Sequence, residues 1–181
     1  MAVYGFRRTV TGRIVLRVDD VEKGLLSMLL GQLIEFVAPD SAAPEDPLAR
    51  LVGIDPDAQS PDDPALARLF PDAYRDDAEA AAEFRRFTER SLRETKVAQA
   101  TTALSTLQRS GEKVTLSAEE AASWLGALTD IRLTLGSRLG ISEESLEELA
   151  GLPDDDPRSA TYHVYDWLTF LQESLVQSLM P

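Results

Sequence analysis

The run YHVYDWLTFLQESLVQSLM, residues 162–180, is the most apolar and aromatic stretch of an otherwise acidic chain. It suits a membrane anchor, a core helix or a helix that docks onto another protein. A membrane-spanning helix needs about 20 nearly uncharged residues, but polar side chains interrupt this run and cluster on one side of a helix. We therefore expect an amphipathic helix that begins at Asp156 and Pro157. Its polar residues are Asp166, Gln172, Glu173 and Gln177, and its apolar face holds Val164, Leu168, Leu171, Leu175 and Leu179.

The charge and composition of the chain exclude several classes of function. Its 181 residues include 31 acidic and 18 basic side chains, which give a formal net charge of -13. Such a surface repels phosphate backbones, so we expect no direct binding of nucleic acid. The absence of cysteine excludes disulfides, thiolate nucleophiles and thiolate metal ligands. The first residues lack the pattern of a signal peptide, which predicts a cytoplasmic protein without a membrane segment.

Hydrophobic periodicity predicts a mainly α-helical single domain that spans residues 1–181. FRRT and RIVLRV alternate around residues 10–12 and predict a short N-terminal β-hairpin. KVTL can join this hairpin and make a three-stranded β element. A loop rich in Pro, Asp and Ala covers about 39–63, with one or two helical turns at PLARLVGI. Helices are expected at about 19–37, 64–70, 78–110 and 117–140, in the acidic segment SEESLEELAG, and in the C-terminal run.

The inventory of residue types argues against an enzyme. A hydrolase triad, a zinc site or a di-iron site needs histidine in suitable company, and His163 is the only histidine. The glycines are scattered and form no phosphate-binding loop. Glu143, Glu144, Glu147 and Glu148 fit a solvated helix face better than a pair of catalytic carboxylates. We therefore expect no catalytic residues, no metal site and no cofactor.

The long helix predicted at 78–110 carries an apolar stripe that does not run its full length. Either the helix bends between about Leu92 and Val97, or its two halves bury different faces. Phe84 and Phe87, in the first half, lie on the other side. The arginines on the stripe form either a solvated basic surface or a patch that binds an acidic partner, and all three are candidate partner-binding residues. The stripe contains Val97, Ala100, Leu104 and Leu107, and its extension meets Arg93, Arg90 and Arg86.

Phe170 projects from the polar side of the C-terminal helix, roughly opposite Leu168. A large apolar ring at that position is expected to pack against other protein atoms. Another element of the same domain can supply these atoms, and so can a protein partner or a second copy of the chain. Phe170 is therefore a further candidate partner-binding residue, and a homodimer stays open.

Arg132 falls inside the apolar arc of the helix predicted at 117–140. Its stem should lie along the edge of the core, with the guanidinium partly buried. A buried guanidinium needs a compensating carboxylate. We expect a structural ion pair from Arg132 to Asp166 or Glu173 on the C-terminal helix.

Three segments of the chain resemble recurrent motifs of a known family. They are LFPDAYRDD at 69–77, DIRLTLGSRLGI at 130–141 and the C-terminal run at 162–180. They are similar to an actinobacterial family long labelled as a domain of unknown function, which includes the actinomycete oxidative stress regulators called AosR. The similarity spans nearly the whole chain. The motifs are specific in pattern but carry no chemistry of their own.

The resemblance implies a non-catalytic cytoplasmic regulator that acts by protein–protein contact. For the AosR proteins, it implies an alternative sigma factor on RNA polymerase as the partner, in the control of oxidative-stress and cysteine-biosynthesis genes. Genes of the family often neighbour genes for cysteine biosynthesis and for the Clp protease adaptor. The alternative is therefore a homodimeric scaffold or an accessory protein of Clp proteolysis. A thiol-based sensor is impossible without cysteine, so this chain either responds to another signal or has a different role.

Overall fold

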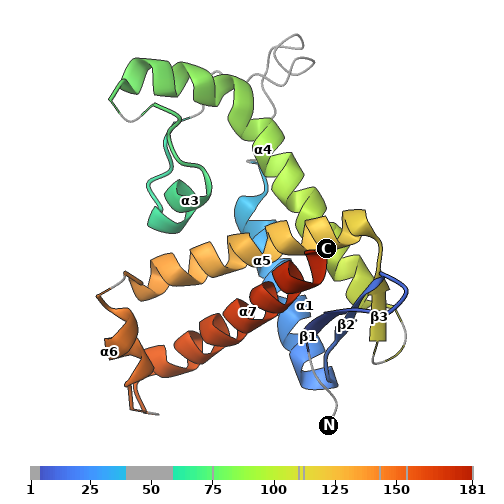
Figure 1. The fold of residues 1–181 in the computed structure, drawn as a ribbon. Helices are drawn as coiled ribbons and strands as arrows, with labels where there is room; N and C mark the ends of the chain where they lie inside the picture. Colours follow the sequence, from blue (N-terminus) through green and yellow to red (C-terminus); the bar gives the residue numbers. More distant parts are fainter. Residues whose placement is uncertain are drawn as a thin grey trace.

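A computed structural model describes residues 5–39, 59–74, 76–109, 111, 113–142, 144–153 and 155–180. Within these ranges the chain is mainly helical, with one small sheet, as the sequence predicts (Figure 1). The helical turns predicted at PLARLVGI lie outside the described residues. The strands are β1 (Gly5–Arg8), β2 (Ile14–Arg17) and β3 (Lys113–Leu116), and the helices are α1 (Asp20–Val37), α3 (Pro64–Leu69), α4 (Ala78–Leu107), α5 (Ala118–Leu139), α6 (Leu146–Ala150) and α7 (Pro157–Leu179).

The sheet is the predicted hairpin extended by KVTL, in the antiparallel order β1-β2-β3. Gly12, at φ 79°, takes the left-handed conformation that closes the turn between β1 and β2. The register aligns Phe6 with Leu16 and Leu16 with Val114. All three side chains are buried, so one face of the sheet packs onto the helices.

Local capping signals set the starts of the main helices. Asp19 accepts from the Glu22 backbone N–H while the Glu22 side chain accepts from Asp19, which forms a capping box. Ser117 and Glu120 form the same motif at the start of α5. Asp156 caps α7, where proline occupies the first turn. The end of α4 differs from the sequence prediction, because the helix stops at Leu107, before the residues leading to Gly111.

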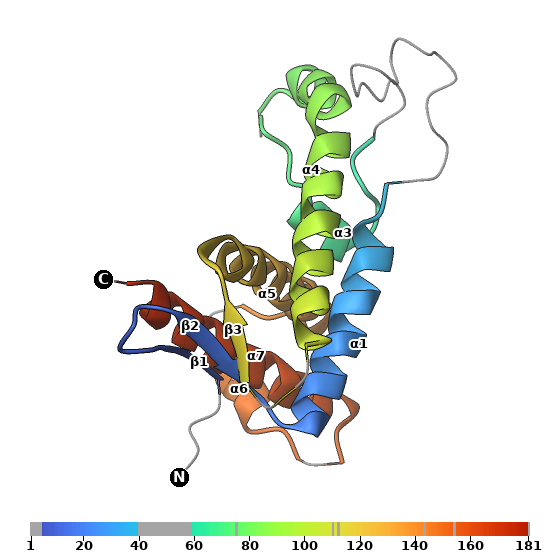
Figure 2. The same cartoon turned by 90° about the vertical axis from the view of Figure 1, so that its right-hand side faces the viewer.

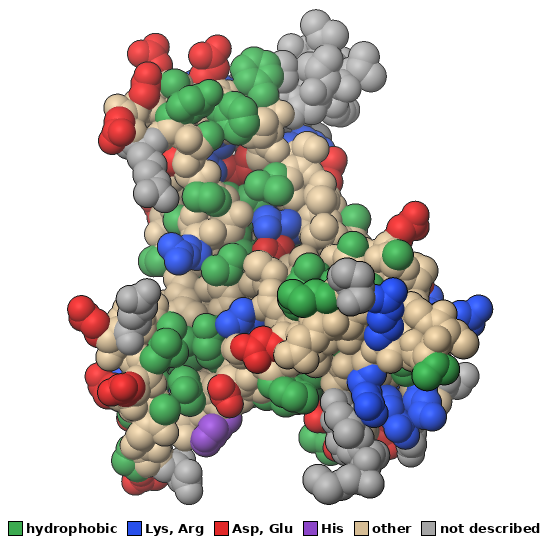
Figure 3. All heavy atoms as spheres, viewed as in Figure 1, with side chains coloured by type: hydrophobic (Ala, Val, Ile, Leu, Met, Phe, Trp, Pro, Cys, Tyr) green, Lys and Arg blue, Asp and Glu red, His purple; other side chains and the backbone are tan. Residues whose placement is uncertain are grey.

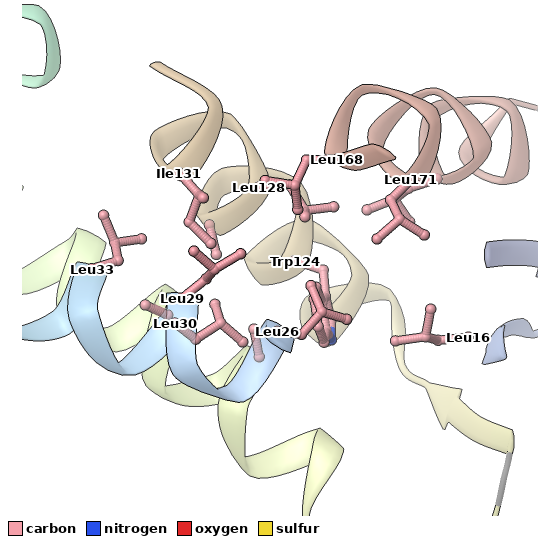
Figure 4. Packing of buried hydrophobic residues seen from close by; sticks show 14 of the residues in the cluster. Leu16, Leu26, Leu29, Leu30, Leu33, Trp124, Leu128, Ile131, Leu168 and Leu171 are labelled. Carbon is pink, nitrogen blue, oxygen red and sulfur yellow. The ribbon is translucent and has the colours of Figure 1, made fainter. Parts of the chain in front are cut away.

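Helix α5 lies at the centre of the core, with Trp124 fully buried on it. The Trp124 indole N–H donates to Thr106 Oγ1 of α4 at 2.9 Å, and Phe6 of β1 meets the indole edge-on with ring centroids 5.6 Å apart. Figure 4 shows leucines from α1 and α7 converging on the same helix from different sides. Trp124 therefore joins the sheet to α4 and α5 within one hydrophobic cluster.

Small residues allow α4 and α5 to pack closely. Ala100 and Ala103 on α4 and Ala127 on α5 are buried. A Cβ added at Gly126 would collide with the Gln99 side chain of α4. The small buried residues at this crossing allow the two backbones to approach closely, and the end of the Gln99 side chain fills the space over Gly126. Figure 2 shows α1 running alongside α4, so the two helices form one layer beside α5.

The C-terminal helix α7 is a core helix, packed against α5 and β1. Leu168, Leu171 and Leu175 are buried, as the sequence predicts. Leu179, predicted on the same face, is exposed because the helix ends there and its last turn passes beyond the core. Among the described residues, no helix has the length and apolarity needed to cross a bilayer.

The leucine face provides a test of this packing with a matched control. Leu175 is 0% exposed and Leu179 is 39% exposed. Leu175→Ala should lower the free energy of unfolding by about 2–5 kcal/mol, because it leaves a cavity against α5. Leu179→Ala should lower it by about 1 kcal/mol or less, because less apolar area leaves water there. Urea denaturation of both variants measures the difference, and equal losses would show that the face is assigned incorrectly.

Candidate protein interface

The inner face of α4 carries charged side chains where an apolar stripe would be expected. From Leu107 backwards, Ala103 and Ala100 continue the buried stripe at helical spacing. The positions that follow towards the N-terminus are Lys96, Arg93, Glu89, Arg85 and Ala81. These charged side chains are largely buried, with 6% exposure for Arg85 and 10% for Glu89. The stripe therefore does not change face, but its chemistry changes from apolar to ionic.

Arg85 ties the segment after α3 to this helix. Its Nη2 donates to the Phe70 carbonyl oxygen at 2.9 Å and pairs with Asp72 at 2.8 Å. Its Nη1 pairs with Glu89 one turn along. The guanidinium is thus satisfied by two carboxylates and one carbonyl. Burial alone would lower the pKa of Arg85, and the Asp72 and Glu89 partners outweigh that effect and raise it.

Arg93 covers the ring of Phe70. Its guanidinium carbon lies 4.3 Å from the ring centroid, within cation–π range. The same group pairs with Glu89 at 2.8 Å and donates to the Val37 carbonyl oxygen at 3.3 Å, near the end of α1. Phe70 itself is buried. One arginine therefore joins α1, α4 and the segment after α3.

Lys96 completes the ionic part of the stripe with a contact to α5. Its ammonium lies 2.6 Å from Asp130 Oδ1, and both side chains are largely buried. Burial raises the pKa of the Asp130 carboxyl, and the neighbouring Lys96 opposes this shift. The pair is therefore a buried cross-link between α4 and α5 whose charges depend on each other.

The structure separates the three arginines that the sequence groups together. Arg93 points inward as described, Arg90 is half-buried and pairs with Glu94 at 3.3 Å, and Arg86 is exposed. The buried arginine of the first half is Arg85, one position from the predicted Arg86. Helix α4 is continuous through Leu92–Val97, so the predicted break is absent. The predicted change of buried face is also wrong, because charged side chains continue the buried stripe into the first half. Opposite charges four residues apart at 85, 89 and 93 are the sequence signal for the network.

Beside the ionic network, the same helix forms a groove with the segment that follows α3, and Arg85 and Glu89 take part in the lining together with apolar side chains. Tyr74, Phe84, Phe87 and Leu92 are all exposed large hydrophobic residues in this part of the chain. The Tyr74 and Phe84 rings stack edge-on with centroids 6.1 Å apart. The groove has a volume of about 410 Å³ and runs along α4 from Ala81 to Thr95, about 20 Å of helix. Exposed aromatic residues gathered in one groove are typical of binding surfaces.

Charge is distributed unevenly around this groove. In Figure 3, hydrophobic and acidic side chains gather over the first turns of α4, and basic side chains gather over the sheet. The basic side chains near the sheet include Arg7, Arg8, Arg13 and Lys113, which are exposed. The exposed acidic side chains between residues 72 and 83 are Asp72, Asp76, Asp77, Glu79 and Glu83. The groove therefore lies at the acidic end of the molecule.

Phe170 is exposed on one side and packed against β1 on the other. A Cβ built at Gly5 would lie 3.3 Å from the ring, and Gly5 has φ 94°, a conformation that favours glycine. The Phe6 backbone N–H donates to Ser174 Oγ at 3.0 Å one turn further along α7. Strand β1 of the same chain therefore buries part of the Phe170 ring. That a partner binds the exposed part stays a prediction.

Arg132 does not form the ion pair predicted from the sequence. Asp166 and Glu173 are exposed on α7. The guanidinium instead donates to neutral acceptors: Thr169 Oγ1 at 3.0 Å, Tyr165 Oη at 3.3 Å and Gln172 Oε1. The α7 residues that face α5 are those at 165, 169 and 172, so helical spacing, not charge, selects the partners.

Comparison with known proteins identifies the family. A family model described as "Domain of unknown function (DUF2017)" matches residues 3–179. The chain belongs to this DUF2017 family. It is 37% identical over 174 residues to the oxidative stress regulator AosR of Mycobacterium tuberculosis, covering 88% of this chain and 78% of that protein. The putative oxidative stress regulator AosR of Mycobacterium leprae is 36% identical over the same length, covering 88% and 79%. No solved structure matches.

Membership of the DUF2017 family confirms the resemblance drawn from the three sequence segments. All three segments lie near the features described above. LFPDAYRDD contains Phe70, Asp72 and Tyr74, and DIRLTLGSRLGI begins at Asp130.

Within the described ranges, no group of three or more histidine, aspartate or glutamate side chains is arranged to hold a metal ion.

The Lys96–Asp130 pair predicts a pH-dependent stability. Lys96→Met leaves the Asp130 carboxylate buried without a partner, which should lower the free energy of unfolding at pH 7 by about 3–5 kcal/mol. The folded pKa of Asp130 is raised above its unfolded value. The stabilising contribution of protonated Asp130 is therefore fully present below its unfolded pKa of about 3.9. It is lost as pH rises through the folded pKa. The deficit of the Lys96→Met variant relative to wild type should shrink on acidification.

Denaturant titrations of wild type and variant measure this deficit. They should cover roughly pH 4 to pH 8, the range over which a carboxyl with a raised pKa titrates. The double variant Lys96→Met/Asp130→Leu removes both charges and should recover most of the lost stability at pH 7. A deficit that is independent of pH, or a double variant less stable than Lys96→Met alone, would contradict a buried ion pair.

Proposed function

We propose that this protein is a non-catalytic cytoplasmic regulator that acts by binding another protein through the groove between α4 and the segment after α3. The observation that carries the proposal is the group of exposed aromatic side chains held in that groove, including Phe84 and Phe87. The relatives named as oxidative stress regulators support a regulatory role in oxidative stress.

The groove suits an amphipathic helix with a basic polar face. Its length along α4, about 20 Å, corresponds to between three and four turns of a docked helix. Apolar residues at i, i+3, i+4 and i+7 of such a helix would contact Phe84, Phe87 and Leu92. Exposed acidic side chains at this end of the molecule, such as Asp76 and Glu83, would attract lysine or arginine on the flanks of the docked helix. Arg86 and Arg90 stay candidate residues for binding carboxylates of the same partner.

The partner that we propose is an alternative sigma factor, free or bound to RNA polymerase, in the control of oxidative-stress and cysteine-biosynthesis genes. A Clp-linked accessory role and a homodimeric scaffold are the alternatives. They differ in what occupies the groove: a Clp component in the first case and a second copy of this chain in the second. Direct measurements with purified proteins distinguish the three.

Two sets of variants with similar exposure test where the partner binds. Phe84 and Phe170 are 47% and 49% exposed, on different faces. Phe84→Ala/Phe87→Ala should weaken binding to the purified sigma factor by about 2 kcal/mol or more, the effect of removing aromatic anchors. Its thermal stability should change by about 1 kcal/mol or less. Biolayer interferometry and thermal melts supply the two measurements.

Phe170→Ala is the matched control, and on this proposal it leaves the affinity within about 0.5 kcal/mol of wild type. If Phe170→Ala weakens binding and the double variant does not, the contact surface lies on α7. Asp76→Asn/Glu83→Gln should mainly slow association, most clearly at low salt. Sedimentation of the free protein decides the scaffold alternative: a dimer that Phe84→Ala/Phe87→Ala dissociates would replace the sigma factor as occupant of the groove.

A further inference from the structure

A second pocket, separate from the groove on α4, lies where α3, α5 and α7 meet. It has a volume of about 390 Å³, within the range of sites that hold small molecules. Its polar lining comes from Arg68 of α3, Arg132, Thr129 and Ser137 of α5, and Tyr165 of α7. Leu133 and Ile141 supply an apolar wall. The lining contains no acidic residue among those the structure describes, although the chain carries a net charge of -13.

Arg132 is fixed in this pocket, and some of its N–H groups have no acceptor among these contacts. A guanidinium has five N–H groups, and Thr169, Gln172 and Tyr165 each accept one of them. One N–H on each Nη atom therefore remains free of these contacts. All three acceptors are neutral, so no carboxylate within the described chain balances the charge.

The acceptors around Arg132 are themselves fixed. Gln172 Nε2 donates to Thr129 Oγ1 at 2.7 Å, and Thr169 Oγ1 donates to the Tyr165 carbonyl oxygen at 2.9 Å. The guanidinium carbon also lies 5.1 Å from the centroid of the Tyr165 ring. These contacts hold the guanidinium in one orientation before any ligand binds, which reduces the ordering cost of binding.

Further donors line the same space. The Tyr165 hydroxyl accepts from Arg132, which leaves its own proton able to donate. Arg68 is exposed and has no ion-pair partner among the described residues. A pocket with two arginines, a phenolic hydroxyl and an apolar wall matches an oxyanion attached to a small organic group, because guanidinium binds carboxylate and phosphate in a bidentate manner.

We infer that the pocket between α3, α5 and α7 binds a small organic anion through its carboxylate or phosphate group, with Arg68 and Arg132 as the cationic contacts. Such a ligand bridges α3 to α5 and α7. Arg68 lies two residues before Phe70, whose position supports the groove on α4. The proposed anion site does not depend on the proposed protein contact, and each can be tested without the other.

The test is calorimetric titration of the full chain with two probes, inorganic phosphate and succinate, at matched ionic strength. Wild type should bind at least one probe saturably. Arg68→Gln should weaken that binding by about tenfold or more, because it removes a charged donor from an exposed position without disturbing the core. Tyr165→Phe keeps the ring and should weaken it several-fold. The tighter probe shows whether the ligand carries phosphate or carboxylate.

Arg158→Gln is the charge-matched control, since Arg158 is exposed on α7 and pairs with Asp156 outside the pocket. Its affinity for the probe should equal that of wild type. Three results would overturn the inference: no saturable binding of either probe by wild type, unchanged binding by Arg68→Gln, or an equal loss in Arg158→Gln and Arg68→Gln. The last result would indicate a general effect of net charge.

Discussion

The ring of Phe70 lies beneath the guanidinium of Arg93, and the Phe70 carbonyl oxygen accepts from Arg85. These two arginines share Glu89, and Arg93 also reaches the end of α1. The segment after α3 is thereby fixed against α4 by ionic and cation–π contacts rather than by apolar packing. Buried ion pairs of this kind add little stability over apolar side chains of the same volume, but removing one partner is costly. We therefore assign the network a positioning role.

This arrangement explains why aromatic side chains of the first half of α4 are exposed to water. With its inner positions filled by Arg85, Glu89 and Arg93, the first half of the helix contributes few apolar groups to the core. Phe84 and Phe87 therefore lie outside the buried stripe, and the fixed segment from Phe70 to Ala73 forms the second wall of the groove. The ionic network and the groove adjoin each other, because Arg85 and Glu89 belong to both.

Sequence reasoning predicts the elements whose signals are local. The capping boxes at Asp19 and Ser117, the alternation of β1 and β2, and the leucine spacing of α7 each depend on residues a few positions apart. The mainly helical class and the three-stranded sheet follow from these signals. Packing partners far apart in sequence are not encoded in that way. The ends of elements are a further weakness, as the exposed Leu179 and the early end of α4 show.

The errors at the candidate sites have a common cause. A stripe drawn only through apolar residues passes over charged residues that are buried with partners, so it does not predict Arg85 and Lys96 as part of the inner face. The carboxylate partner predicted for Arg132 follows from charge alone, whereas the residues of α7 that accept from it are neutral.

The most direct test of the central claim is hydrogen–deuterium exchange of the protein alone and in the presence of the proposed partner, a purified alternative sigma factor or RNA polymerase. If the groove on α4 is the contact surface, amides in residues 70–74 and 81–95 should gain protection on binding, and those of β1, β2 and the Phe170 region of α7 should not. Protection confined to the sheet or to the region around Phe170, with residues 81–95 unchanged, would contradict the account.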